Sequence, residues 1–398
     1  MAKTDGCDDR AWLVGPEGRR WLAELTAGGV GERRLRRELT AERSRLVVEQ
    51  VALRERARAK FGELAERMFF TRVGLEQATD CWVAAYKAQR FAEGRLVHDL
   101  CCGIGGDLLA LAERREAVGV DRDAGVAAFA EANLVASGQS LGRVTVGDVE
   151  QYAIERGAAW HLDPDRRSDR GRSTRVELHS PGPELVGRLR EGNPDGVVKL
   201  APAAEAPSEW EAEAEREWIT RGRECRQQAV WFGGLPAKPG CRRATVVRAV
   251  DHQVVAESFS ATPVAADSAS EPAQFLYDPD PSVVAAGLAG AFATQHGLQT
   301  LGPSGVYLTG PKRASPLAAC FRVGDVLPLR EKAVGGTLRA QGVGIVEIKQ
   351  RGVGVDPERF RKSLKLQGDG RATLVLTRVG ERRIAVVTER VSDPTEGG

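Results

Sequence analysis

The chain has 398 residues, of which 42% are hydrophobic and 28% are charged, and its formal net charge is +2. This length is enough for two or three domains, and the composition is that of an ordinary soluble globular protein. No apolar run approaches the length of a membrane span, and no stretch near the beginning resembles a signal peptide, so we expect a cytoplasmic protein without membrane contact.

The cysteines give no sign of a disulfide framework or of a metal site. They are odd in number and scattered along the chain, with no C-x-x-C pair and no Cys/His cluster at metal-ligand spacing: Cys7, Cys81, Cys101, Cys102, Cys225, Cys241 and Cys320. We therefore expect reduced thiols and no bound metal.

Charge is unevenly distributed along the chain. Residues 1–92 carry 18 Lys/Arg and 14 Asp/Glu, and residues 320–391 carry 15 and 8, which leaves residues 93–319 acidic. Basic ends around an acidic middle suit a protein that grips a polyanion from outside its central domain. The alternative is a solvated surface that happens to be rich in Arg, which makes up 47 of the 57 basic residues.

Residues 1–92 are predicted to be helical. Their apolar side chains recur with the spacing of one helix face, as in Leu53, Ala57, Phe61, Leu64 and Met68. Thr40 stands where this helix would begin. A second helix, introduced by residues 74–80 and running through Lys87, would lie over the ligand site that follows. We interpret its polar residues as caps or surface groups: Glu76, Gln77 and Thr79.

The most informative stretch is Asp-Leu-Cys-Cys-Gly-Ile-Gly-Gly-Asp at residues 99–107. It follows the apolar run 96–98 and precedes the helix-compatible run 108–112, so it predicts a turn between a strand and a helix. Its glycines let the backbone approach a ligand closely. The order D-x-x-x-G-x-G-G differs from the dinucleotide pattern G-x-G-x-x-G, and an acid ahead of the glycines suits a cationic or amino-bearing ligand.

Further short apolar strands are predicted to alternate with helical stretches such as 125–134. They lie at residues 117–121, 144–148, 160–163 and 196–200. This alternation is typical of a parallel α/β sheet, which binds ligands at the carboxyl ends of its strands. Four acids are expected there: Asp99, Asp121, Asp148 and Asp163. Each acid alone could instead be a solvated strand-end or capping residue.

Two more strands, near 229–232 and 244–247, are expected to close the sheet. A Pro-, Ala- and Ser-rich linker at 261–272 then leads through residues 274–281 into a helical segment, 282–296. The last region contains three predicted strands and one helix, at 344–349, 373–378, 383–387 and 357–364. The expected organisation is a helical region, a central domain, a connector and a small α/β domain: 1–92, 93–260, 261–319 and 320–392.

Together these motifs resemble the bacterial class I S-adenosylmethionine (SAM)-dependent methyltransferases that carry a C-terminal THUMP-like domain. The resemblance rests on the glycine turn, on Asp163-Pro164-Asp165-Arg166-Arg167, and on the segments 277–281 and 347–352. It implies a Rossmann-like, seven-stranded methyltransferase sheet with an N-terminal helical region and a small α/β THUMP-like domain. It also implies SAM as cofactor, methyl transfer as the reaction, and RNA as the expected partner, by analogy with domains that dock RNA.

Carried onto this chain, the resemblance assigns roles to individual residues. The methionine end of SAM would be held by Asp99, Cys101, Gly103, Gly105 and Gly106. Asp121 would bind the ribose and Asp148 the adenine. The acceptor side would be formed by Asp163, Pro164 and Arg166 as catalytic residues. Substrate contacts would come from Arg167, Lys199, Lys349 and Arg351.

The acceptor loop leaves several chemistries open. Enzymes that methylate amino groups often use D/N-P-P-Y/F/W here, and the aromatic residue is missing after Asp163 and Pro164. Arg166 could stack on a base or grip a phosphate. Uracil-C5 methylation needs a cysteine nucleophile, and Cys225 is poorly placed for it. Ribose 2′-O methylation uses a lysine–aspartate pair, which Lys199 and Asp163 could supply, although Lys199 could equally be a strand-end lysine without a role.

Two other classes of function remain as alternatives. One is a methyltransferase for an acidic small molecule, with a structural C-terminal domain. The other is a SAM- or RNA-binding protein without catalysis. An RNA enzyme should lose affinity steeply as salt rises, because phosphate contacts release counterions, whereas a small-molecule enzyme should depend on salt only weakly.

Overall fold

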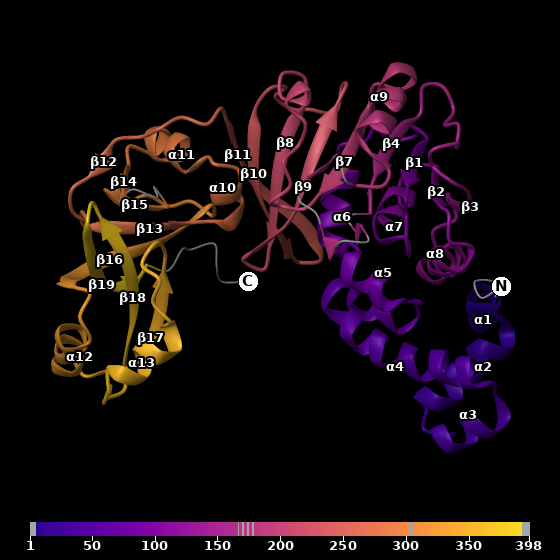
Figure 1. The fold of residues 1–398 in the computed structure, drawn as a ribbon, viewed down its shortest axis with the longest axis horizontal. Helices are drawn as coiled ribbons and strands as arrows, with labels where there is room; N and C mark the ends of the chain where they lie inside the picture. Colours follow the sequence, from indigo (N-terminus) through magenta and orange to yellow (C-terminus); the bar gives the residue numbers. More distant parts are fainter. Residues whose placement is uncertain are drawn as a thin grey trace. The chain divides into compact units, whose positions relative to one another are not determined.

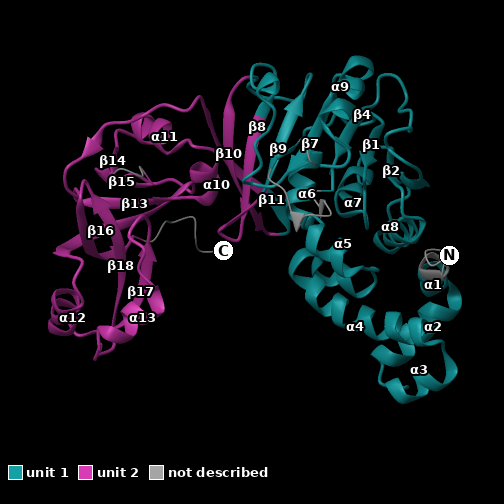
Figure 2. Ribbon diagram, in the orientation of Figure 1, with its two compact units in different colours: residues 1–215, 227–239, 252–254 teal, residues 216–226, 240–251, 255–398 magenta. Residues whose placement is uncertain are grey.

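The computed structural model describes residues 5–165, 167, 168, 171, 172, 175, 176, 179–302 and 306–391 (Figure 1). The chain forms two compact units, coloured separately in Figure 2. The first unit holds residues 1–215, 227–239 and 252–254. The second holds residues 216–226, 240–251 and 255–398. In the part of the chain that the structure describes, no helix is long and apolar enough to cross a bilayer.

The first unit begins with the expected helical region. Its elements are α1 (Asp5–Val14), α2 (Pro16–Thr26), α3 (Glu32–Glu38), α4 (Ala41–Phe61), η1 (Gly62–Glu66), α5 (Arg72–Gln77) and α6 (Cys81–Ala88). Thr40 caps α4 as expected, since its Oγ1 accepts a hydrogen bond from the Arg43 N–H at 3.2 Å. Helix α4 ends earlier than the apolar spacing predicts, because Gly62 has a φ of +57° and turns the chain away. Met68 is nevertheless buried.

The sheet strands of this unit follow in the predicted α/β order. The strands are β1 (Val97–Leu100), β2 (Ala117–Asp121), β3 (Gly142–Val146), β4 (Ala159–Leu162), β7 (Gly196–Leu200) and β9 (Glu224–Phe232). The helices between them are α7 (Gly106–Ala112), α8 (Ala124–Ser137) and α9 (Pro183–Gly192). Strands β3, β2, β1, β4 and β7 pair in parallel with their neighbours, and β9 runs antiparallel to β7. Short elements complete the unit: β5 (Arg167–Ser168), β6 (Gly171–Arg172) and η3 (Ser208–Trp210).

The sheet is larger than the seven strands expected. Its nine strands lie in the order β11-β10-β8-β9-β7-β4-β1-β2-β3, and the additional members are β8 (Glu215–Arg221) and β11 (Gln253–Ala261), beside the expected β10 (Arg242–Val250). By the residue ranges above, β10 and nearly all of β8 and β11 are counted in the second unit. Strand β8 begins Glu-Arg-Glu, a charged pattern that predicts surface, yet both glutamates are fully buried. Arg90 pairs with Glu215, and Arg243 with Glu217, so the cost of burying these charges is offset.

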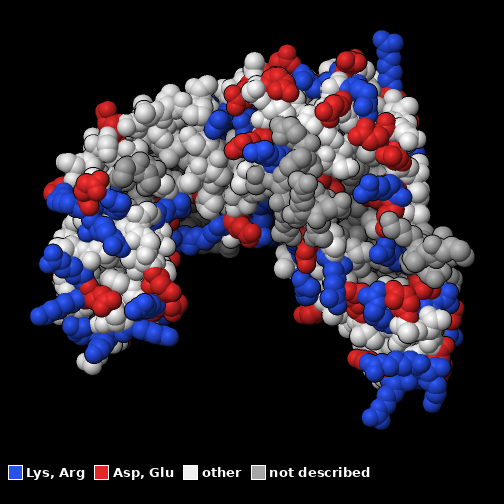
Figure 3. All heavy atoms as spheres, viewed as in Figure 1, with Lys and Arg blue, Asp and Glu red and all other residues white. Residues whose placement is uncertain are grey.

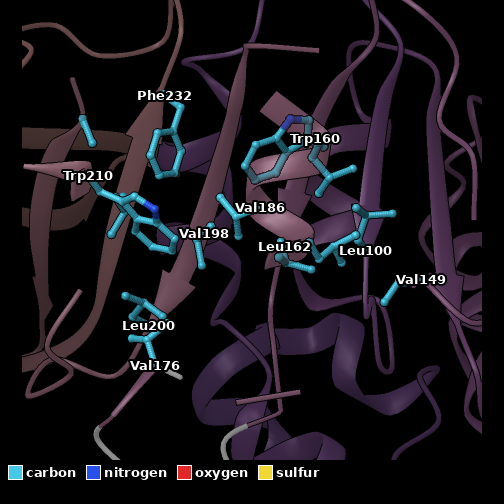
Figure 4. Packing of buried hydrophobic residues seen from close by; sticks show 14 of the residues in the cluster. Leu100, Val149, Trp160, Leu162, Val176, Val186, Val198, Leu200, Trp210 and Phe232 are labelled. Atoms are coloured by element: carbon cyan, nitrogen blue, oxygen red, sulfur yellow. The ribbon is translucent and has the colours of Figure 1, made fainter. Parts of the chain in front are cut away.

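Large aromatic side chains fix the middle of the sheet (Figure 4). The Phe232 ring centroid lies 6.0 Å from that of Trp160 and 5.3 Å from that of Trp210. Trp160 also lies directly against the backbone of Gly196, where a Cβ atom would stand 2.0 Å from the indole. This close contact holds β4 and β7 together, and these are the strands that carry the predicted acceptor residues.

The second unit contains an eight-stranded sheet in the order β12-β14-β15-β13-β16-β19-β18-β17. The strands are β12 (Ser268–Ala269), β13 (Phe275–Pro279), β14 (Gln299–Leu301), β15 (Tyr307–Gly310), β16 (Ala318–Pro328), β17 (Val343–Gln350), β18 (Gly370–Val379) and β19 (Arg382–Arg390). The helices are α10 (Pro281–Ala285), α11 (Ala289–His296), α12 (Glu331–Ala340) and α13 (Pro357–Ser363). The three predicted C-terminal strands and α13 are confirmed.

The structure also contains strand β16 and helix α12, which the sequence analysis did not predict. The sequence of α12 contains a Gly-Gly pair that argues against a helix. At Gly335, however, a Cβ atom would stand 2.9 Å from the carbonyl oxygen of Leu364 just after α13, so this glycine permits a close approach of the two helices. The apolar side chains Val334, Leu338 and Phe360 then share one buried cluster.

Candidate functional site

The first unit contains a cavity of about 560 Å³ at the carboxyl ends of its parallel strands. Nearly all the predicted site residues of this unit that the structure describes line it: Asp99, Cys101, Gly103, Gly106, Asp121, Asp148, Asp163, Pro164 and Lys199. Gly105 does not line the cavity. It precedes α7 with a φ of +87°, a conformation that favours glycine.

The glycine turn between β1 and α7 is shaped by its neighbours. The Gly103 N–H donates to Asp121 Oδ2 at 2.9 Å, and the Asp123 N–H donates to Asp121 Oδ1 at 2.9 Å. Gly103 has a φ of +55°, and no atom stands within 4 Å of the place where its Cβ would be. Burial raises the pKa of Asp121, against the lowering effect of these two backbone donors.

The turn is also tied to the N-terminal helices. The buried Asn133 amide donates to the Ile104 carbonyl at 2.9 Å, and its oxygen accepts from the Phe69 N–H at 2.7 Å. Lys60 on α4 donates to the carbonyls of Leu75 and Ala78, each at 2.7 Å, and so stabilises the end of α5. Gln77, the last residue of α5, lines the cavity together with Ala78 and Thr79, as expected for a segment over the ligand site.

The acids beside the cavity lie in different environments. Asp99 is inside β1 and buried, rather than beyond the end of the strand as predicted. Asp121 ends β2 and is partly buried. Asp148 lies two residues past β3, is exposed, and accepts from the Glu150 N–H at 3.0 Å. The differences arise because β1 lies between β4 and β2 inside the sheet, whereas β3 is at its edge.

A buried polar network lies beneath the turn. Asp99 Oδ1 is 2.7 Å from His161 Nδ1, and His161 Nε2 is 3.1 Å from Lys87 Nζ. Lys87 Nζ is in turn 2.7 Å from Asp107 Oδ1. The second carboxylate oxygen of Asp99 is buried and has no hydrogen-bond partner among the described residues. An oxygen of this kind can accept a hydrogen bond from a ligand in the cavity.

Burial and charge act in opposite directions on these groups. Burial raises the pKa of Asp99, although His161 lowers it. Burial lowers the pKa of Lys87, although Asp107 acts against this. For Asp107, the neighbouring Lys87 and the other nearby cations outweigh burial and hold its pKa well below the ordinary range.

Sequence analysis missed this network. Lys87, Asp107 and His161 received no role, and Thr79, interpreted as a cap or surface group, is buried and donates to Asp107 Oδ2 at 2.6 Å. The available signal was a histidine in the middle of a short apolar strand, together with a lysine in an apolar helix. Such polar groups are rarely buried without partners.

The acceptor loop starts directly after β4. Asp163 Oδ2 lies 2.6 Å from Lys199 Nζ, which also donates to the Gln77 carbonyl at 2.9 Å. Asp165 exchanges two backbone hydrogen bonds with Ser180, at 2.9 and 3.0 Å. Arg166 and the side chain of Arg167 lie outside the described residues, so their predicted roles stay predictions.

Lys349 and Arg351 belong to the second unit. Both pair with Asp278 on β13, at 2.9 Å and 3.1 Å. They do not line the cavity of the first unit. Their predicted contact with substrate stays a prediction, and in the structure they neutralise a carboxylate. Among the described residues, no group of His, Cys, Asp and Glu side chains is arranged to hold a metal ion.

Known proteins resemble this chain both in its C-terminal region and over most of its length. Residues 318–390 match the model of the THUMP domain-like family. Uncharacterized S-adenosylmethionine-dependent methyltransferases of Mycobacterium tuberculosis, from strains H37Rv and CDC 1551, are 35% identical over 364 residues, which cover 89% of this chain and 98% of each relative. A crystal structure of a candidate methyltransferase from Porphyromonas gingivalis W83 has the same fold, with a TM-score of 0.72 at 20% identity, covering 89% of this chain and 92% of that one.

Proposed function

Because this chain belongs to the S-adenosylmethionine-dependent methyltransferases, we propose that it transfers the methyl group of SAM to a nucleotide of RNA. RNA is proposed as the substrate because residues 318–390 match the THUMP domain-like family. The same region holds nearly twice as many basic as acidic residues. Basic side chains gather over the part of the second unit that holds α12 and α13 (Figure 3). Such a surface suits the phosphate backbone of a nucleic acid.

The cavity residues fit SAM, a ligand with a sulfonium and an ammonium group. Carboxylates outnumber cations in the lining, which favours a cationic ligand. We propose that the partnerless oxygen of Asp99 accepts the ammonium, that Asp121 accepts the ribose hydroxyls, and that Asp148 accepts the adenine amino group. The open side of Gly103 leaves space for close approach. When bound, SAM supplies a methyl group that is already activated for transfer.

The role of the protein is then mainly to orient the acceptor. Lys199 binds one oxygen of Asp163 and is itself held by the Gln77 carbonyl, so the carboxylate is fixed from two elements. We propose that the other oxygen, Asp163 Oδ1, accepts a hydrogen bond from the acceptor group and directs its lone pair at the methyl carbon. Pro164 is buried and fixes the start of the loop.

The Asp163–Lys199 pair favours a hydroxyl acceptor, such as a ribose 2′-OH, as a second form of the same proposal. A carboxylate can orient the hydroxyl, and an adjacent ammonium can favour the developing alkoxide. Uracil-C5 methylation is less well supported, because it needs a thiolate. Burial raises the pKa of both cysteines that line the cavity, Cys101 and Cys102, and so disfavours the thiolate.

The dependence of methyl transfer on salt tests the choice of RNA. The purified enzyme is given labelled SAM and total RNA, and transfer is measured at increasing salt. We expect the apparent affinity for RNA to fall steeply, while the affinity for SAM changes little. Equal and weak salt dependence of both would favour the small-molecule alternative.

A further inference from the structure

A second cavity, of about 570 Å³, lies among the N-terminal helices of the first unit. It is lined by residues of α3, α4 and α5, and we call it the helical groove. Three residues line both the helical groove and the cofactor cavity: Arg45, Glu49 and Arg72. The two spaces therefore share a wall, and a ligand that extends out of the cofactor cavity on this side meets the helical groove.

The two spaces differ in charge. Among the described residues, nine carboxylates and five cations line the cofactor cavity. In the part of the chain that the structure describes, the charged residues that line the helical groove are four arginines and two glutamates: Arg36, Arg45, Arg56 and Arg72, and Glu32 and Glu49. A cationic cofactor is favoured in the first space and an anionic group in the second.

The groove arginines are available to a new partner. Arg36 and Arg72 have side chains that are 72% and 73% exposed. Arg36 pairs with Glu32, and Glu49 pairs with both Arg45 and Arg72. The Arg36–Glu32 pair is exposed at both ends and contributes little free energy, so a phosphate can compete for Arg36. Glu49 is only 14% exposed, so a phosphate would share Arg45 and Arg72 with this carboxylate and bind their exposed sides. Basic side chains gather over the place of α3 on the face drawn in Figure 3.

The floor of the helical groove is apolar and not aromatic. Val48, Ala52 and Leu53 of α4 contribute to it, and no aromatic side chain is among the described residues that line it. Proteins that hold single-stranded nucleic acids by their bases use aromatic stacking surfaces. A groove with arginines and no stacking surface suits the backbone of the nucleic acid instead.

We propose that the helical groove binds the phosphate backbone of the RNA on one side of the nucleotide that enters the cofactor cavity. This inference rests on the proposed function, and it assigns backbone binding to the N-terminal helices in addition to the THUMP-like region. The anchors Asn133 and Lys60 fix these helices to the cavity, so the groove has a defined place beside it.

The test compares two double variants of the full-length chain. In the first, Arg36→Glu and Arg56→Glu reverse two charges of the groove. In the matched control, Arg33→Glu and Arg58→Glu reverse two exposed charges on the same helices that do not line it. Binding of a fluorescein-labelled oligouridine is measured by anisotropy at several salt concentrations, and SAM binding is measured by calorimetry.

We expect the groove variant to bind the oligouridine more than tenfold more weakly than the control variant. The slope of log affinity against log salt should fall in magnitude by about 1.4, since each phosphate contact with a single strand contributes about 0.7. SAM affinity should be unchanged in both variants, which shows that the fold is intact. Equal loss of oligouridine affinity in the groove and control variants, or no loss in either, would overturn the proposal.

Methyl transfer to total RNA distinguishes failure of the groove assignment from failure of the proposed function. If the unaltered chain methylates RNA and the groove variant binds and methylates like the control, the proposed function stands and the groove assignment is wrong. If the unaltered chain neither methylates nor binds RNA, both are wrong. If the groove variant instead loses affinity for an acidic peptide only, the groove is a protein-binding surface and the assignment to RNA is wrong.

Discussion

Lys199 Nζ lies 2.6 Å from Asp163 Oδ2, so a lysine at the end of β7 and an aspartate just after β4 form one pair in the cavity wall. Adjacent parallel strands bring these residues together, because Leu162 on β4 is in register with Val198 on β7. The pair leaves Asp163 partly exposed, whereas Lys199 is mostly covered. Asp163 is therefore the member that can contact the methyl acceptor.

Replacing Asp163 by Ala should strongly reduce methyl transfer and preserve SAM binding. We expect transfer to fall by about 10²-fold to 10³-fold, as when a group that orients or stabilises the reacting atoms is removed. The measurement is the initial rate with labelled SAM, paired with calorimetric SAM affinity. If transfer and SAM binding fall together, Asp163 holds the cofactor and does not orient the acceptor.

Replacing Asp121 by Ala should weaken the binding of SAM itself. The variant loses the carboxylate that we expect to accept the ribose hydroxyls and that receives the Gly103 N–H. The affinity for SAM should fall by about tenfold to a hundredfold, in line with hydrogen bonds to a charged group. Titration calorimetry measures this directly, and an unchanged dissociation constant would refute the assignment.

The buried Lys87–Asp107 pair should matter for stability. Replacing Lys87 by Met leaves the Asp107 carboxylate buried with a cation removed, and we expect a loss of about 3 to 5 kcal/mol in the free energy of unfolding. Denaturant unfolding measures it. The double variant Lys87→Met, Asp107→Leu should be more stable than Lys87→Met alone, because it removes the unpaired charge. A double variant no more stable than Lys87→Met would contradict this explanation.

Asp107 should also contribute a pH-dependent part of the stability. Because its folded pKa is held below the unfolded value, the unfolded chain binds more protons, and stability rises with pH through this window. The contribution is complete above the unfolded pKa of about 3.9 and is lost as the pH falls through the folded pKa. The stability difference between the natural chain and Asp107→Asn should therefore shrink below about pH 4. A difference that stays constant on acidification would show that Asp107 acts only through packing.

Local sequence patterns were sufficient to predict the strands and the glycine turn around the cavity. The glycine turn, strand β2 with its terminal Asp121, and strand β7 with Lys199 are each encoded within a few consecutive residues, and their place at one edge follows from parallel pairing. This is why the acids that line the cavity, and the loop after β4, could be predicted as site residues from the sequence alone. The THUMP-like region was recognised from its sequence in the same way.

Long-range partners could not be predicted in this way. His161 meets Asp99 and Lys87 from positions 62 and 74 residues away, and nothing in the sequence around either partner specifies the pairing. Strand β8 was missed because its buried glutamates depend on Arg90 and Arg243, which lie on other segments. Tertiary pairing overrides the local polarity in both cases.

Transfer of labelled methyl groups by the full-length enzyme shows which class of molecule accepts the methyl group. The enzyme is offered SAM with a tritiated methyl group, together with total RNA or with the small-molecule fraction of cells that lack its gene. We expect label in RNA, lost in the Asp163→Ala variant, and nucleoside analysis would then identify the methylated atom. Label that enters only the small-molecule fraction would contradict the assignment to RNA.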